Sequence, residues 1–158
     1  MKRSPCFWVI RFPLHQTGIM TGMKMQTLYS VVTLAECMQN PATLDWLVHS
    51  EVPLPEGTPP GWYPTPAEIR RVIENTPGIA ASYRVSPSVW EVTVTSRKDV
   101  TWATLIVQDY CGDEETSCRF AFSGGWDELI VLVTSRLARQ CGPLVLLHDS
   151  GAAPQVVW

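Results

Sequence analysis

The sequence predicts an α+β fold, in which an antiparallel sheet has helices packed on one face. Four expected strands follow one another between residues 80 and 123, while the expected helices lie before and after this run. Strands that are segregated from helices along the chain are typical of α+β proteins. With 158 residues, 46% of them apolar, the chain is long enough to bury one core of ordinary size.

The expected strands span residues 25–33, 80–85, 89–95, 102–110, 118–123 and 144–147. They are predicted from their β-branched and aromatic content and from apolar residues that alternate with polar ones. The alternation is clearest at Trp90, Val92 and Val94, and it indicates a strand with one buried and one solvated face. Phe120 and Phe122 are expected to face the core in the same way.

Three helices are expected, at residues 41–49, from Pro66 to the stop signal at 76–78, and at 126–140. Asn40 is the expected N-cap of the first helix. Thr65 and Glu68 have the spacing of a capping box at the start of the second. The third helix places its apolar residues on one face, which we expect to pack on the sheet; these residues are Leu129, Ile130, Val133 and Leu137, together with Trp126.

Residues 23–150 are predicted to form a single domain, residues 1–22 to be a disordered extension or a misassigned start, and residues 151–158 to be a tail. Residues 1–25 contain four basic residues and no acidic one. Their apolar stretch, Cys6–Ile10, has only five residues, whereas the apolar region of a signal peptide needs about 7 to 15. We therefore expect no secretory signal.

Charge and cysteine content weaken several function classes. Twelve Lys and Arg residues against fifteen Asp and Glu residues argue against a protein that mainly binds nucleic acid phosphates. No apolar run reaches the roughly 18 residues that a transmembrane helix needs. The five cysteines form no C-x-x-C pair and have no histidine at metal-ligand spacing, so we expect no metal site and no cofactor.

Free thiols are typical of a reducing compartment, and a cytoplasmic protein is the resulting expectation. Cys111 and Cys118 flank a short turn, so the sequence also allows them to face each other across a hairpin.

Motifs that would identify a catalytic site are missing from the sequence. Gly124 and Gly125 precede a helix, but the acidic residues Asp127 and Glu128 in its first turn would repel an anion there. His148, which Asp149 follows, fits half of an acid–base dyad or simply a polar residue at a strand end. Neither a phosphate-binding loop nor a nucleophile elbow is present. We therefore predict no catalytic residue, and an enzyme with a dispersed active site remains an alternative.

Two segments are candidates for binding a partner protein. Residues 51–66 contain six prolines, and Trp62 and Tyr63 lie within this stiff loop without an obvious core partner. Asp113, Glu114 and Glu115 form an acidic turn that would attract a basic surface. The alternatives are that the aromatic pair folds back on the domain and that the turn is merely solvated.

The segments F-S-G-G-W-D-E-L-I, from Phe122 to Ile130, and R-L-A-R-Q-C-G-P-L-V-L, from Arg136 to Leu146, resemble the closing helix–strand unit of small bacterial immunity proteins. These are the antitoxins of polymorphic or contact-dependent toxin systems. The resemblance implies a cytosolic, non-enzymatic protein that binds and blocks a cognate toxin. Two alternatives remain, namely a ligand-binding or accessory domain and the enzyme already mentioned.

Overall fold

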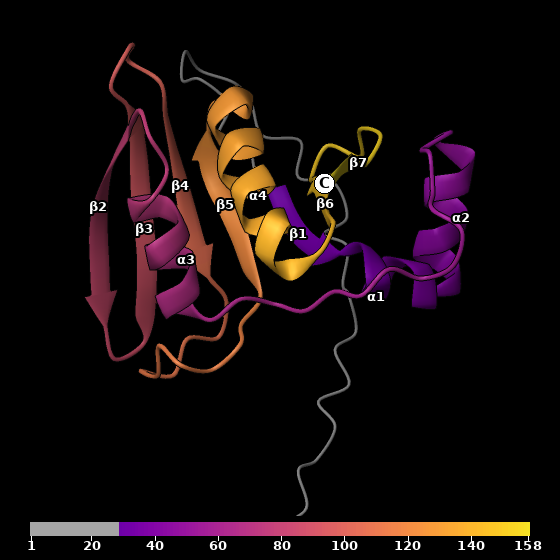
Figure 1. Ribbon diagram of the computed structural model, residues 1–158, viewed down its shortest axis with the longest axis horizontal. Helices are drawn as coiled ribbons and strands as arrows, with labels where there is room; N and C mark the ends of the chain where they lie inside the picture. Colours follow the sequence, from indigo (N-terminus) through magenta and orange to yellow (C-terminus); the bar gives the residue numbers. More distant parts are fainter. Residues whose placement is uncertain (1–28) are drawn as a thin grey trace, which may run out of the picture.

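Seven strands form one antiparallel sheet in the computed structural model, which describes residues 29–158 (Figure 1). The strands are β1 (Tyr29–Thr33), β2 (Ile79–Ser86), β3 (Val89–Ser96), β4 (Trp102–Val107), β5 (Phe120–Gly125), β6 (Leu144–His148) and β7 (Gln155–Val157). Their order across the sheet is β2-β3-β4-β5-β1-β6-β7, and every neighbouring pair is antiparallel. The predicted α+β class with an antiparallel sheet is therefore confirmed.

Four helices of the described residues 29–158 cover the sheet, and they lie on both of its faces. They are α1 (Leu34–Gln39), α2 (Pro41–His49), α3 (Pro66–Glu74) and α4 (Asp127–Cys141). Val31 and Leu146 point into the core beneath α3 and α4, whereas Val32 and Val145, which come next to them in the chain, belong to the core beneath α1 and α2. Because neighbouring residues of a strand point to opposite faces, the two helix pairs lie on opposite sides of the sheet.

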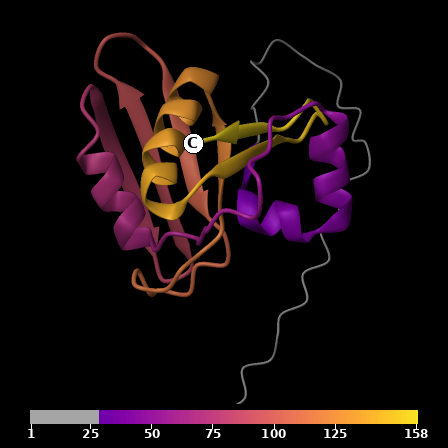
Figure 2. The ribbon, with the colours of Figure 1, turned by 45° about the vertical axis from the view of Figure 1, so that its right-hand side comes forward.

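Figure 2 shows the same arrangement, with β6 and β7 between α4 and the α1–α2 pair. The expectation that helices cover one face is correct for α3 and α4 and wrong for the β1–β6–β7 end of the sheet. There the strands are apolar on both faces, so both faces need a cover.

The larger core lies between the sheet and the α3–α4 layer. All four apolar residues that were predicted to face the sheet from α4 are buried there, and so are Trp90, Phe120 and Phe122. Trp126 is an exception, because 40% of its surface is exposed. It is the N-cap of α4 and has extended backbone angles, so the helical spacing does not apply to it.

The predicted start signals form as expected. The Asn40 side chain accepts a hydrogen bond from the backbone N–H of Ala42 at 3.0 Å, and α2 begins at Pro41. At α3, Thr65 Oγ1 accepts from the N–H of Glu68, while the Glu68 carboxylate accepts from the N–H of Thr65. The capping box predicted from these two residues is confirmed.

Other predictions differ from the structure at the ends of elements. The sequence did not predict α1, and the expected tail at 151–158 contains the edge strand β7, which pairs with β6. Gly124 and Gly125, which lie beyond the strand expected at 118–123, belong to β5, next to a register shift against β4. A Cβ on Gly125, whose φ is 137°, would lie 2.4 Å from Ala103 Cα, so the close approach of β4 requires glycine.

The expectations for residues 1–22, and for residues 25–28 of the first strand, lie outside the described residues. Among residues 29–158, no helix combines the length and the apolar character needed to cross a lipid bilayer.

Replacing Leu137 by alanine should lower the free energy of unfolding by about 2–5 kcal/mol, because Leu137 lies on the inner face of α4 and is fully buried. Urea or guanidinium denaturation measures the change. Leu132→Ala is the matched control: Leu132 lies on the same helix but is only half-buried, so its loss should be smaller. Equal stability losses for the two variants would contradict the assigned core.

Candidate functional site

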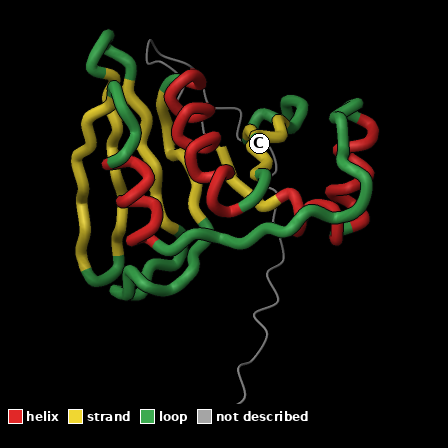
Figure 3. Tube along the Cα trace, viewed as in Figure 1, coloured by secondary structure: helices red, strands yellow, loops and turns green. Residues whose placement is uncertain are grey.

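The two segments that were predicted to contact a partner lie side by side. We call residues 51–65, between α2 and α3, the proline loop, and residues 108–119, between β4 and β5, the acidic loop. Figure 3 shows the proline loop as the long green segment that runs from α2 to α3. The N–H of Cys118 donates to the Pro64 carbonyl, and the N–H of Ala67 donates to the Glu114 carbonyl, both at 3.0 Å. The first bond joins the two loops, and the second joins the acidic loop to the first turn of α3.

The end of α4 holds the proline loop from the other side. The N–H of Trp62 donates to the carbonyl of Cys141 at 3.0 Å. Gly142, which follows α4, has a φ of 83°, and a Cβ at this position would lie 2.2 Å from the Pro60 carbonyl oxygen. Only glycine therefore allows this close approach of the proline loop to α4.

Trp62 and Tyr63 are neighbours in the proline loop but differ in their surroundings. The Trp62 side chain is 52% exposed. The Tyr63 hydroxyl donates to Glu36 Oε2 at 2.5 Å and accepts from the N–H of Thr33 at 3.3 Å. Burial, with a further contribution from the bond to Glu36, raises the pKa of Tyr63 well above its usual range. Tyr63 is thus held within the domain, while Trp62 faces solvent.

Arg119, at the end of the acidic loop, connects this loop to Glu36 and Tyr63. We call the contacts among Glu36, Tyr63 and Arg119 the junction of the two loops. The Arg119 guanidinium forms an ion pair with Glu36 and lies over the Tyr63 ring, 5.1 Å from the ring centroid. The Glu36 carboxylate therefore connects α1, the proline loop and the acidic loop.

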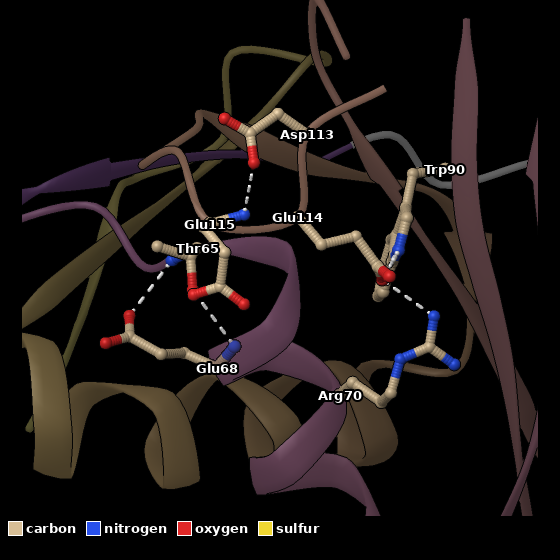
Figure 4. A network of polar contacts seen from close by, with 7 residues as sticks. All are labelled: Thr65, Glu68, Arg70, Trp90, Asp113, Glu114 and Glu115. Carbon is tan, nitrogen blue, oxygen red and sulfur yellow. Dashed lines mark hydrogen bonds and ion pairs between the residues drawn. The ribbon is translucent and has the colours of Figure 1, made fainter. Parts of the chain in front are cut away.

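The three consecutive acidic residues also have different roles. Glu114 Oε1 accepts hydrogen bonds from Arg70 Nη2 and from Trp90 Nε1, each at 2.7 Å (Figure 4). The bond from Arg70, and then the bond from Trp90, hold the pKa of Glu114 below its usual value. Asp113 and Glu115 are exposed, and Asp113 Oδ1 accepts from the N–H of Glu115 at 2.8 Å. Asp113 and Glu115 therefore present their charges to solvent, whereas Glu114 is paired inside the chain.

Arg70 of α3 connects Glu114 to the sheet. Its guanidinium carbon lies 4.3 Å from the centroid of the Tyr83 ring and 5.6 Å from that of Trp90. The two rings also meet edge to face, with centroids 5.8 Å apart. Arg70 therefore links α3 to β2 and β3 by cation–π contacts and to the acidic loop by an ion pair.

The His148 environment does not have the geometry of a catalytic triad. His148 Nδ1 lies 2.5 Å from Ser150 Oγ and 3.6 Å from Asp149 Oδ1. In a triad the base uses one ring nitrogen for the nucleophile and the other for the acid, but here both groups meet the same nitrogen. Nδ1 also accepts from the N–H of Ser150 at 3.0 Å, which is a local turn at the end of β6.

The described cysteines are Cys37, Cys111, Cys118 and Cys141, and all four are free. Burial raises the pKa of Cys37, Cys118 and Cys141 to about 12, so these thiols stay protonated near neutral pH. Within residues 29–158, no cluster of three or more His, Cys, Asp or Glu side chains is arranged to hold a metal ion.

A pocket of about 410 Å³ lies beside β7, between residues 50–53 and residues 154–158. Its lining contains neither histidine nor cysteine. Residues 51–53, at the start of the proline loop, line this pocket, whereas Trp62, Tyr63 and the acidic loop do not.

The sequence did not predict the inward partners of Tyr63 and Glu114. Glu36 precedes Tyr63 by 27 residues and Arg119 by 83, and Arg70 precedes Glu114 by 44. No local spacing signals such pairs, because they form only after the sheet has brought α1, α3 and the acidic loop together.

Comparison with known proteins gives no relative: no family model, no curated protein and no solved structure matches the chain.

Tyr63→Phe should lower the free energy of unfolding by about 1–3 kcal/mol, because it removes a hydrogen bond to the Glu36 carboxylate and leaves the N–H of Thr33 without its acceptor. Chemical denaturation measures the loss. Tyr110→Phe is the matched control, since the Tyr110 hydroxyl makes no hydrogen bond within residues 29–158 and its removal should cost less. A Tyr63→Phe protein as stable as the control would show that the junction does not hold the loop.

Glu114→Gln should destabilise the protein most at neutral pH. A carboxylate whose pKa is lowered by folding stabilises the native state above its ordinary pKa of 4.5, and this contribution is lost as the pH falls through the lowered value. The difference in unfolding free energy between the wild type and Glu114→Gln should therefore shrink on acidification below about pH 4.5.

Denaturation curves recorded between about pH 3 and pH 7 test this expectation, because this range includes pH values on both sides of the ordinary pKa of the Glu114 carboxyl, 4.5. Glu115→Gln removes an exposed carboxylate from the same turn and should change the stability at pH 7 less than Glu114→Gln does. A difference for Glu114→Gln that stays constant across the pH range would contradict the role of the ion pair.

Proposed function

We propose that this chain is a non-enzymatic protein-binding module of the immunity type, which binds and neutralises a cognate toxin in the cytoplasm. The observation that carries the proposal is the junction of the proline loop and the acidic loop. It places the exposed Trp62 and the exposed carboxylates of Asp113 and Glu115 on loops that hydrogen-bond to each other. Exposed tryptophan and exposed charge are each typical of binding surfaces.

The rigidity of both loops supports binding. Ordering a flexible loop costs free energy when a complex forms, and a loop that is already fixed avoids most of that cost. The proline loop is restricted by its prolines, by the Tyr63–Glu36 bond and by its contact with the end of α4. The acidic loop is fixed by Glu114 and Arg119.

The charge of the domain favours a basic partner. Residues 29–158 contain eight Lys and Arg residues against fifteen Asp and Glu residues, a net charge of −7. Glu36, Glu91 and Glu114 form ion pairs with arginines. Asp113 and Glu115 add negative charge that attracts a basic surface, such as that of a toxin domain that binds phosphates.

The resemblance to immunity proteins involves a different part of the chain. The resembling segments form the end of β5, α4 and β6, and their apolar residues are mostly buried. They would account for a shared scaffold, while the two loops would determine the partner.

Trp62→Ala should mainly speed dissociation of the complex, because it removes a large contact residue from a preformed loop. Asp113→Asn combined with Glu115→Gln should mainly slow association and flatten its dependence on salt, because it removes charge that steers the encounter. The partner is first purified with the full chain from the native host, and both rates are then measured by surface plasmon resonance.

Glu74→Gln combined with Glu128→Gln is the matched control, since it removes two exposed negative charges from other elements. This control should leave association closer to the wild-type rate than the loop variant does. An equal effect of both double variants would refute the assigned surface. Failure to recover any partner, together with turnover of a small substrate that His148→Ala abolishes, would refute the binding module in favour of an enzyme.

A further inference from the structure

Strand β2 is a long, regular edge of the sheet. All eight of its residues, from Ile79 to Ser86, pair with β3 without a register shift. Figure 1 shows β2 at the margin of the molecule, where no other described element lies beyond it. Apart from the Ile79 carbonyl, which accepts from Arg97 Nε, its outward backbone N–H and C=O groups therefore form a row that is available for pairing with another strand.

The described surroundings of β2 protect this edge at one end only, where Arg97 Nε donates to the Ile79 carbonyl at 3.2 Å. The strand contains no proline, and its one charged residue, Arg84, forms an ion pair with Glu91 of the neighbouring β3 at 3.0 Å. The opposite edge differs, because β7 has only three residues and directly follows Pro154. Short strands and prolines limit edge pairing, so β2 is the better template of the two.

We infer that β2 pairs with β2 of a second copy of this chain, antiparallel and about a two-fold axis at Ser82. Such an axis joins the same patch of both copies and closes the assembly as a dimer. In the joined sheet, opposite residues of the two β2 strands must point to the same side. Only then do the helix-covered faces of the two copies lie on one side of the sheet. With Ser82 opposite Ser82 this condition holds, and Val85, which is 45% exposed, lies opposite Ile79 of the second copy.

The charge around β2 is compatible with self-association, although residues 29–158 carry a net charge of −7. Arg84 is neutralised by Glu91, and α3, which packs on β2, exposes both Arg71 and Glu74. In the proposed register Arg84 lies opposite Ala80, so the two Arg84 residues are four positions apart along the edge, roughly 13 Å. That separation exceeds the screening length of about 8 Å at physiological ionic strength.

Sedimentation velocity of the full chain over a range of concentrations tests the inference, which does not rest on the proposed function. A reversible monomer–dimer equilibrium is expected. Ser82→Lys should weaken dimerisation roughly fivefold or more, because it places two like charges directly opposite each other. Mixing Ser82→Lys with Ser82→Glu should restore a dimer, because the opposite residues then have opposite charges.

Ser117→Lys adds the same charge in the acidic loop and should leave the dimer unchanged. Hydrogen exchange of the wild type provides a second measurement, which needs no variant: outward amides of β2 should become protected as the concentration rises. A chain that stays monomeric at all concentrations, or a dimer that Ser82→Lys does not weaken, would overturn the inference. If β2 paired only with a strand of a different protein, the purified chain would stay monomeric at all concentrations.

Discussion

The position of the acidic loop depends on one carboxylate, that of Glu114. Two donors of different chemistry, the Arg70 guanidinium and the Trp90 indole, meet the same oxygen. Arg70 is itself held between α3 and the aromatic rings of β2 and β3, so the carboxylate ties a loop to a helix and to the sheet at one point. Hydrogen bonds that involve a charged partner are stronger than neutral ones. The Arg70–Glu114 ion pair is such a bond, and it is only partly shielded from water.

Glu36 does for the proline loop what Glu114 does for the acidic loop. It accepts the Tyr63 hydroxyl and pairs with Arg119, and these two partners come from two different loops. The two glutamates thus fix both loops independently of their exposed residues. This separation is the physical basis for giving Tyr63 and Glu114 structural roles, and for proposing Trp62 and Asp113 as contact residues.

Much of the fold follows from local signals in the sequence. The capping box at Thr65, the alternation around Trp90 and the apolar face of α4 are each decided by residues within a few positions of one another, and all three predictions are confirmed. The short helix α1 was not predicted because it has six residues and follows a strand directly, with Thr33 as its cap. Strand β7 has only three residues, and it is stabilised by pairing with β6, which no pattern within the strand reveals.

The candidate site could be predicted only as a list of residues. Proline content and a run of acids identify two exposed loops, but the choice of inward and outward side chains depends on contacts across 27 to 83 residues. Trp126 shows the same limit, since its helical spacing predicts burial and its cap position leaves it exposed.

The need for glycine at position 142 limits how the sequence can change during evolution. Because the proline loop passes so close to the end of α4, a side chain at this one position would displace the whole loop. Trp62 and Glu115, by contrast, can change with little effect on folding, since their side chains are largely outside the core. The surface can therefore diversify rapidly on an unchanging frame, and sequences that share this frame can differ completely in the residues they expose.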